Sequence, residues 1–476
     1  MEKFSRFLAA VGQWFPHHGV KGLCFAGCVG GMLALQGADW PTYRADAARS
    51  GVTSETLPPP LVAAWEWQSP HRPRRIWKGE AKADLYHKIY DLPDRQEFDK
   101  VFHVAVADGA VFFGSSADDK VYCLDAATGQ ERWSFFTEGP IRLAPTVVDG
   151  RVYVGSDDGC VYCLEAADGR LVWRTRIGPR DQRVPGNGRL ISLWPVRTGV
   201  LVSNGVAYCG AGMFPSEGVY LCALDAATGK ERWKVVNHNL PAVGYLLISP
   251  RRIYVPAGRN NPVVYDRRNG HRIRVVQGAG GTYALLTGDL LIFGPGKAGK
   301  LEAVTGESGD QLATFPGRHM IVTPTRSYLQ GGDQLSALDR ARYLTLARQR
   351  KAALAQRDQL RKELAQAEKQ HDTAAIARLK AALNEVGGKL DYYSREMDAC
   401  LLWRKPCSHP LSLILAGDTL YAGGHQSVAA YDTTDGARTW QAPVKGLVYG
   451  LAAAEGRLFV STDEGTISCF STSASQ

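Results

Sequence analysis

The sequence lacks the short motifs of two common hydrolase classes, because its 11 histidines form no H-E-x-x-H pair and no G-x-S-x-G turn occurs. It also has no long uninterrupted hydrophobic run. Positive charge is in small excess, because the chain has 56 Lys and Arg residues and 47 Asp and Glu residues. Of this excess of 9, residues 340–400 carry 13 minus 8, or 5. These absences argue against a zinc protease, a serine hydrolase of that type and a nucleic-acid partner.

The first 38 residues have the composition of a targeting segment. Lys3, Arg6 and Lys21 precede LCFAGCVGGMLALQGA, which is apolar but too short and glycine-rich for a comfortable membrane span. We expect residues 1–38 to be a signal peptide cleaved near Ala38, with an uncleaved anchor or lipidation at Cys28 as alternatives. The predicted location is therefore periplasmic or secreted, with membrane association only through the N-terminus.

Apolar residues make up 45% and charged residues 22% of the chain, as in ordinary globular proteins. Glycine, however, is 51 of 476 residues, above the usual share of about 7%. Since glycine favours tight turns, this excess predicts many short strands.

An internal repeat dominates the chain: KVYCLDAATGQERW, CVYCLEAADGRLVW, YLCALDAATGKERW and VAAYDTTDGARTW. In each copy a strand leads to a turn closed by glycine, and tryptophan follows that glycine by four residues. Two more strands precede each copy, which gives four strands per repeat of about 40 residues, the pattern of a propeller blade. The tryptophans expected to cover the seams between blades are Trp65, Trp133, Trp173, Trp233, Trp403 and Trp440.

Eight positions that open the repeated turn predict an all-β, eight-bladed propeller of four-stranded blades. They are Asp125, Glu165, Asp225, Asp266, Glu302, Asp339, Asp432 and Ser471. Blade 4 has Arg274 in place of tryptophan, and blade 5 is expected to carry a longer turn ending at Phe315. The last repeat ends after three strands, so the isolated strand at 61–67 is predicted to supply its fourth strand and close the ring.

A helical insertion interrupts blade 6. Residues 376, 379, 383, 386, 390, 393 and 397 follow helical spacing, Leu346, Ala353, Leu360 and Ala367 form an opposing stripe, and Asp372 fits an N-cap. The expected organisation is propeller at 39–339, an antiparallel (coiled-coil) helical hairpin at 340–400, and propeller again at 401–476. The hairpin is either a self-packed spacer or a docking arm.

The pattern A-x-D-x-x-T-G-x-x-x-W resembles the repeat of quinoprotein-like (pyrroloquinoline-quinone repeat) β-propellers, and DWPTYRADAARSG is similar to an opening found in their secreted members. The resemblance covers about residues 39–470 apart from the insertions. The family includes quinone dehydrogenases and the propeller lipoprotein of the outer-membrane β-barrel assembly machine. The resemblance therefore implies the fold and leaves enzyme and scaffold roles open.

The dehydrogenases of this family hold their quinone between a tryptophan and a disulfide of adjacent cysteines, with calcium bound by acidic and amide side chains. No Cys-Cys pair occurs in this sequence. Trp194 is the candidate stacking residue, and Asp157, Asp158, Asn260 and Asn261 are the candidate calcium ligands. We expect no metal and no cofactor, with pyrroloquinoline quinone and calcium as the alternative.

Loops that converge on one mouth of a propeller channel usually bind its ligand or partner. The candidates there are Arg142, Arg183, Trp194, Arg197, Arg259, Asn260, His319 and His425. They would suit a protein partner or an anionic small molecule, unless the arginines pair with Asp118, Asp119, Asp157 and Asp158. We expect a noncatalytic binding or assembly scaffold; the alternatives are a quinone-dependent oxidoreductase and a sugar- or polymer-binding propeller.

Blade alignment also places Cys209 opposite Cys222 as a possible disulfide.

Overall fold

The structure is a computed structural model that describes residues 38–76, 97–186, 188–258, 260–278, 280–281, 283–288, 290–295, 299–306 and 308–472. The predicted signal or anchor segment, except Ala38, lies outside the described residues, as does Arg259. No helix in the described ranges is long and apolar enough to cross a membrane.

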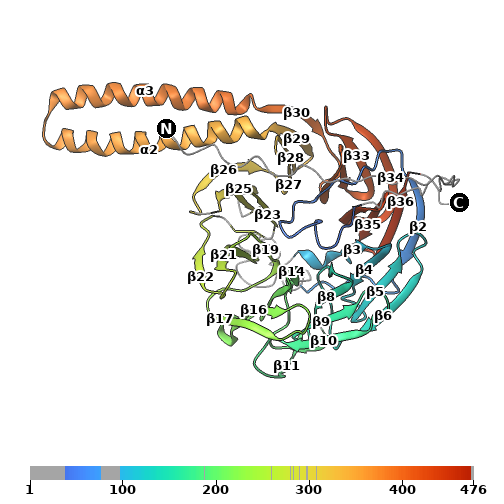
Figure 1. Ribbon diagram of the computed structural model, residues 1–476. Coiled ribbons are helices and arrows are strands. Elements are labelled where there is room, and N and C mark those ends of the chain that lie inside the picture. Colours follow the sequence, from blue (N-terminus) through green and yellow to red (C-terminus); the bar gives the residue numbers. More distant parts are fainter. Residues whose placement is uncertain are drawn as a thin grey trace, which may run out of the picture. The chain divides into compact units, whose positions relative to one another are not determined.

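Six antiparallel sheets of four strands follow one another along the chain, each with its strands in sequence order. The first three are β3 (Val104–Ala107), β4 (Ala110–Gly114), β5 (Lys120–Asp125) and β6 (Glu131–Phe136); β7 (Thr146–Val148), β8 (Arg151–Gly155), β9 (Cys160–Glu165) and β10 (Leu171–Arg176); and β14 (Leu201–Ser203), β15 (Val206–Ala211), β16 (Val219–Asp225) and β17 (Glu231–Asn237). The next three are β19 (Leu247–Ile248), β20 (Arg252–Ala257), β21 (Asn260–Asp266) and β22 (Arg272–Val275); β23 (Tyr283–Thr287), β24 (Leu290–Gly294), β25 (Lys300–Thr305) and β26 (Gln311–Pro316); and β27 (His319–Val322), β28 (Arg326–Gly331), β29 (Gln334–Asp339) and β30 (Leu401–Pro406). The sheets are arranged in a ring, and the first strand of each lies nearest its axis (Figure 1).

An eight-stranded sheet joins the two ends of the chain. Its strands, in order, are β1 (Val52–Thr53), β31 (Ser412–Ala416), β32 (Thr419–Gly423), β33 (His425–Asp432), β34 (Arg438–Ala454), β35 (Arg457–Thr462), β36 (Thr466–Ser471) and β2 (Val62–Gln68). The first half of β34 pairs with β33 and its second half with β35, so one strand serves two four-stranded units. The predicted pairing of the 61–67 strand with the last repeat is confirmed, because β2 pairs antiparallel with β36.

The tryptophans cover the seams as expected. Trp173 donates from its indole nitrogen to the carbonyl of Ala226 at 3.0 Å. Its ring lies so close to Gly229 that a Cβ there would come within 2.6 Å, and Gly229 has φ +71°. The same donation to a neighbouring carbonyl is made by Trp65, Trp133, Trp233, Trp403 and Trp440. Arg274 takes the place of tryptophan against Gly309 and donates to the carbonyl of Gly306 at 2.7 Å.

One predicted turn position is wrong. Thr305, not Glu302, opens the fifth turn: its N–H donates to the Asp310 carbonyl at 3.0 Å, and the Gly309 N–H donates to the Thr305 carbonyl at 2.9 Å. Asp125 makes the same two bonds in the first repeat. The turn therefore has the ordinary length, and Ala313 rather than Phe315 follows its glycine by four residues. A search for acids missed it because the Thr305 hydroxyl, which accepts from Asp310 N–H at 3.1 Å, takes the role of the aspartate side chain.

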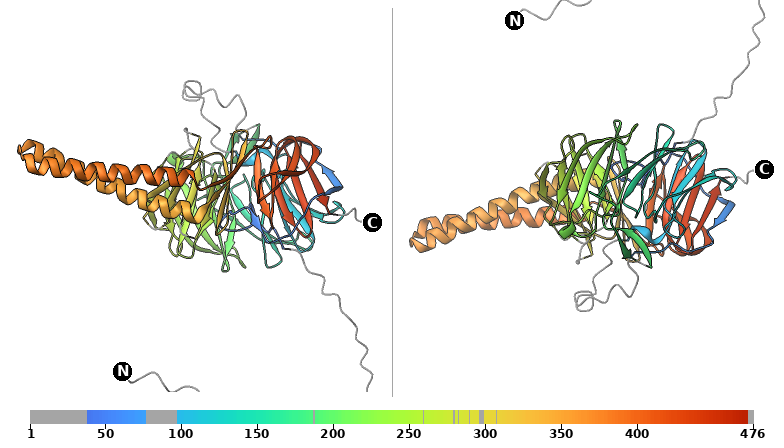
Figure 2. Two further views of the ribbon diagram at one scale, coloured as in Figure 1. Left: turned by 90° about the horizontal axis from the view of Figure 1, so that it is seen from above. Right: turned by 90° about the horizontal axis from the view of Figure 1, so that it is seen from below.

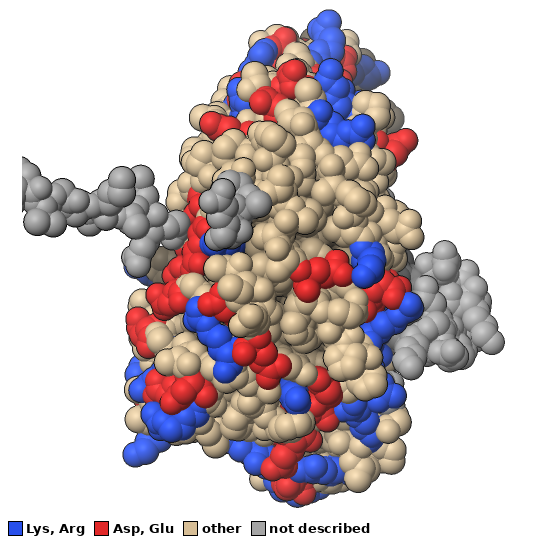
Figure 3. Space-filling view, turned by 90° about the vertical axis from the view of Figure 1, so that its right-hand side faces the viewer, with Lys and Arg blue, Asp and Glu red and all other residues tan. Residues whose placement is uncertain are grey.

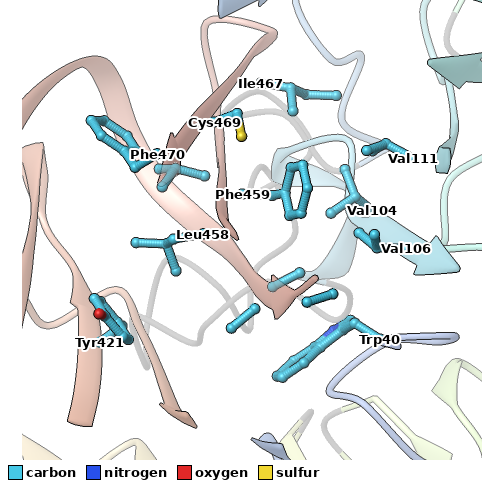
Figure 4. Packing of buried hydrophobic residues seen from close by; sticks show 14 of the residues in the cluster. Trp40, Val104, Val106, Val111, Tyr421, Leu458, Phe459, Ile467, Cys469 and Phe470 are labelled. Carbon is cyan, nitrogen blue, oxygen red and sulfur yellow. The ribbon is translucent and has the colours of Figure 1, made fainter. Parts of the chain in front are cut away.

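Residues 40–53, which we call the channel plug, contact the inner strands of most sheets. Backbone bonds join Trp40 to Val106 in both directions, and the plug carbonyls of Pro41, Ala47, Ala48 and Gly51 accept from the inner-strand N–H groups of Val147, Ile248, Leu286 and Leu415. Trp40 is buried in the core cluster that also contains Val106 and the last two strands of the chain (Figure 4). The plug thus connects sheets that are far apart in sequence.

Two arginines fasten the plug. Arg49 is 1% exposed and donates to the carbonyls of Leu246 and Tyr43 at 3.0 Å each. Arg44 donates to the carbonyls of Leu413 at 3.1 Å and Met320 at 3.4 Å. Burial lowers the pKa of Arg49 to about 10, which still leaves it charged at neutral pH.

The helices α2 (Arg340–Lys369) and α3 (Thr373–Asp398) lie in the chain between β29 and β30, which pair with each other. They run side by side and project beyond the sheets (Figures 1 and 2). Asp372 caps α3, as predicted, by accepting from Ala375 N–H at 2.9 Å. The buried residues Leu346, Ala353, Ala367, Leu379 and Val386 belong to the two predicted stripes.

Candidate functional site

A small cavity lies on the ring axis above the channel plug. The plug bonds near the C-terminal ends of inner strands such as β19, β23 and β31, whereas the cavity is lined by residues at or just before the N-terminal ends of β3, β27 and β31. Its volume is about 40 Å³, and Trp40, Tyr43 and Arg44 of the plug form part of its lining. The plug therefore closes one end of the channel. The cavity lies toward the other end, where the connections from one sheet to the next are found.

Two histidines line this cavity from different strands. His103 immediately precedes β3, and His319 begins β27. Burial lowers the pKa of His103 to about 4. Burial, followed by the positive charges of Arg44, Arg318 and Lys100, lowers the pKa of His319 to about 3. Both imidazoles are therefore neutral at pH 7.

The predicted residues Arg142 and Arg197 are brought together, but in a buried ion-pair cluster. Arg142 Nε donates to Asp157 Oδ2 at 2.7 Å and its Nη1 to Asp99 Oδ2 at 3.1 Å. Arg197, with no exposed surface, donates to the same Asp157 oxygen at 3.0 Å. Burial lowers the pKa of Arg197 to about 10, so it too remains charged. This cluster holds four segments of the chain together, and both guanidinium groups are buried, so neither is available to a ligand at the surface.

Arg183 and Trp194 also form hydrogen bonds within the protein. Arg183 donates to Glu138 Oε2 at 2.5 Å, at the partly exposed base of the β11 (Arg183–Gly186) and β12 (Arg189–Ser192) hairpin. Trp194 is 3% exposed and donates from its indole to the Glu217 carbonyl at 2.8 Å. A second hairpin arginine, Arg189, pairs with Asp119. The pairing of mouth arginines with nearby acids, expected as the alternative to an open basic funnel, is thus present here.

The remaining predicted residues lie apart from each other. Asn260 begins β21, is exposed and faces Ala257 in the register. His425 begins β33 and is exposed. Among the predicted site residues that the structure describes, only His319 lines the axial cavity. Sequence reasoning missed His103, Lys100, Arg318 and Tyr449, although His103 and Arg318 directly precede inner strands and Lys100 lies four residues before one, where connections between blades are expected to meet.

The residues present do not fit the quinone and calcium arrangement. A fused three-ring quinone does not fit into a cavity of about 40 Å³. Trp194 is buried away from solvent, and Asp157 is already bound by two arginines. Asp158 accepts from the Cys160 N–H at 2.8 Å and from the Tyr162 hydroxyl. Within the described ranges, no three His, Cys, Asp or Glu side chains are grouped so as to hold a metal ion.

Cys209 and Cys222 stand directly opposite each other in the β15–β16 register, as predicted. Both are buried free thiols in the structure. The disulfide itself stays a prediction. The alternative is two buried free thiols. Nonreducing peptide mapping of exported protein decides between them, because a disulfide gives one Cys209–Cys222 peptide and free thiols give two separately alkylated peptides.

Similarity to known proteins agrees with this architecture. A family profile described as outer membrane protein assembly factor BamB matches residues 67–193, 159–316 and 424–475. The serine/threonine-protein kinase AfsK of Streptomyces griseus is 28% identical over 160 residues, which are 32% of this chain and only 18% of that kinase.

Two solved structures share the fold. The quinohemoprotein alcohol dehydrogenase ADHIIG of Pseudomonas putida HK5 has a TM-score of 0.58 at 12% identity, over 92% of this chain and 81% of that one. The computationally designed Ika8 protein has a TM-score of 0.54 at 11% identity, over 78% of this chain and 96% of its own. Because the profile matches 67–316 and 424–475, more than half of the 476 residues, the chain belongs to the family described as outer membrane protein assembly factor BamB.

Proposed function

We propose that the protein is an eight-bladed β-propeller that works as a noncatalytic binding or assembly scaffold in the periplasm or outside the cell. The eight-stranded sheet counts as two blades that share β34, which with the six four-stranded sheets makes eight. In this count α2 and α3 are an insertion in blade 6. The family name and the sequence features of the first 38 residues support the location.

The observation that carries this proposal is the channel plug. In a propeller enzyme the axial channel must hold cofactor and substrate, but here residues 40–53 fill one end and leave about 40 Å³ above them. Arg44, Arg142 and Arg197 donate hydrogen bonds to backbone carbonyls or to carboxylates. The channel interior thus stabilises the ring, and the outer faces remain for recognition.

The mouth opposite the plug is the proposed partner face. It carries two large exposed apolar side chains, Leu190 at 62% and Phe214 at 49% exposure, on the β11–β12 hairpin and the β15–β16 connection. It also carries the cations Lys100 and Arg318, each just before an inner strand. Apolar anchors beside cations suit a protein partner with an acidic rim.

Photo-crosslinking in the cell of origin tests this face. A photoreactive amino acid replaces Phe214 at the mouth, Tyr392 on α3, or Arg404 on the outer strand β30 as a matched exposed control. We expect a discrete crosslinked protein from position 214 and none from position 404. Capture from position 392 alone would contradict the mouth proposal and assign docking to the hairpin. No capture from 214 or 392 would contradict the scaffold function.

A further inference from the structure

The axial cavity combines a polar side with an apolar side. Its lining includes the polar residues His103, His319 and Tyr449 and the apolar residues Leu413, Ile414 and Leu451. By the usual measure, 40 Å³ is room for about three water molecules. That is the size of one carboxylate group with the first carbon of its alkyl chain. A bulky oxyanion would place several oxygens against the leucines and isoleucine without donors.

Two cations that form no ion pair with the described residues lie next to lining residues of this cavity, although neither is part of the lining itself. The Lys100 ammonium lies 4.7 Å from the ring centroid of Tyr449, and Arg318 is adjacent in the chain to His319. Neither forms a salt bridge or side-chain hydrogen bond with any residue that the structure describes. This sets them apart from Arg142, Arg183, Arg189 and Arg197, each of which is held by a carboxylate.

More cations than anions lie near His319 and Tyr449. The charged groups that act on His319 and Tyr449 comprise four cations and two anions: Arg44, Arg75, Lys100, Arg318, Glu97 and Asp463. Asp463 accepts from the Leu447 N–H at 2.7 Å and faces Arg75 at 3.6 Å, so it does not neutralise Lys100 or Arg318. Because the two histidines are neutral at pH 7, they can donate an N–H without adding charge.

We propose that this cavity binds one carboxylate group carried on a short alkyl chain, with Lys100 and Arg318 as its counter-ions and the apolar wall against its methylene carbons. The inference rests on the proposed function, because it makes the mouth opposite the plug the binding face. The carboxylate comes from a Glu or Asp side chain of a protein partner or from a free small acid; both sources present the same chemistry.

Ligand-observed NMR on the full chain tests the proposal, with acetate as the probe. We expect a saturation-transfer signal from acetate with the unaltered protein. The double variant Lys100→Gln/Arg318→Gln should bind acetate at least tenfold more weakly, while the exposed control Arg404→Gln should bind as the unaltered protein does. The charge-retaining variant Lys100→Arg/Arg318→Lys should keep affinity within threefold. Unchanged acetate binding in the double glutamine variant, or absence of acetate binding in the unaltered protein, would overturn the proposal.

Two further probes distinguish the two sources of the carboxylate and test the preference for a carboxylate over phosphate. A short blocked peptide containing one glutamate, compared with its glutamine counterpart, should bind more tightly than acetate if the carboxylate comes from a protein. Acetate should bind at least as tightly as that peptide if the source is a free acid. Inorganic phosphate should compete weakly, and preference for phosphate over acetate would overturn the assignment.

The test also separates this inference from the scaffold function. If position 214 still captures its partner while no carboxylate binds, only the cavity assignment fails. If acetate binds as expected but nothing is captured, the scaffold function fails and the carboxylate site stands. The melting temperature of the double glutamine variant should lie within a few degrees of that of the unaltered protein, since among the described residues neither replaced side chain forms an ion pair and only the Lys100–Tyr449 ring contact is lost.

Discussion

The channel plug and the helical hairpin are both additions to the repeat, yet they relate to the ring in opposite ways. Residues 40–53 bond to inner strands of six sheets, and their arginines are buried. The α2–α3 pair buries its apolar stripes mainly between its own two helices, and it contacts the ring at its base, where Leu344 lies in a core cluster with Phe315 and Met320. A short segment at the axis can therefore hold more of the structure together than a long one at the edge.

The distribution of charge also differs between the ring and the helical hairpin. On the side of the molecule shown in Figure 3, basic and acidic side chains are interspersed. Residues 340–400, by contrast, hold 5 of the 9 excess positive charges. The ring is nearly balanced, and the projecting helices carry much of the net charge, as their solvation requires.

Deleting residues 39–68 should give the largest effect. The deletion removes the plug and also β2, the outer strand paired with β36, so the ring loses its axial connections and its closure. We expect loss of cooperative unfolding in thermal denaturation followed by circular dichroism. A truncated protein that melts at the original temperature would contradict both roles.

Arg49→Gln isolates the plug without shortening the chain. The substitution leaves the buried carbonyls of Leu246 and Tyr43 without their donor, which should lower the free energy of unfolding by about 3 kcal/mol. The matched change in the hairpin is Arg342→Gln, because Arg342 forms an exposed pair with Glu396. It should cost less than about 1 kcal/mol. Equal losses in urea denaturation would remove the distinction between the two regions.

The stability should depend on pH through the histidines above the plug. The pKa of His319 is about 3 in the folded state and that of His103 about 4, both below the ordinary value of about 6.5. Between the folded and the ordinary pKa values, the unfolded chain therefore binds more protons than the folded protein. The contribution of the neutral histidines to stability is complete above about pH 6.5 and decreases as the pH drops toward 4. His319→Gln should reduce this loss by roughly 1–3 kcal/mol, measured by urea denaturation at pH 7 and pH 4.5. The exposed His425→Gln should leave the pH dependence unchanged, and an unaltered slope in His319→Gln would show that His319 does not contribute.

Replacing residues 341–399 with an Asn-Gly turn should give the smallest effect. Leu338 of β29 pairs with Leu401 of β30, so a short turn can connect the two strands. We expect a soluble propeller whose melting temperature changes by only a few degrees. Insoluble protein would show that α2, which contacts β26 and β28, supports the core.

The repeat made the sheets, the closing strand and the helical hairpin predictable, because glycine turns, alternating strands and helical spacing are local signals. The Cys209–Cys222 register was also predictable, by aligning one repeat on another. The turn at Thr305 was missed, because a hydroxyl there replaces the expected carboxylate.

The contacts of the plug and the pairing of Arg142 and Arg197 with Asp157 depend on loops that meet only when the ring closes. For the same reason, the cavity between His103 and His319 has no signal in the sequence.

The central claim is that this propeller binds without catalysing a quinone-dependent oxidation. The most direct measurement is the mass and absorption spectrum of the purified full chain after incubation with pyrroloquinoline quinone and calcium, followed by gel filtration. We expect an unchanged mass and no quinone absorption in the protein fraction, because the cavity beside the channel plug has a volume of only about 40 Å³. Stoichiometric retention of quinone, with reduction of an electron-accepting dye when an alcohol is added, would contradict it.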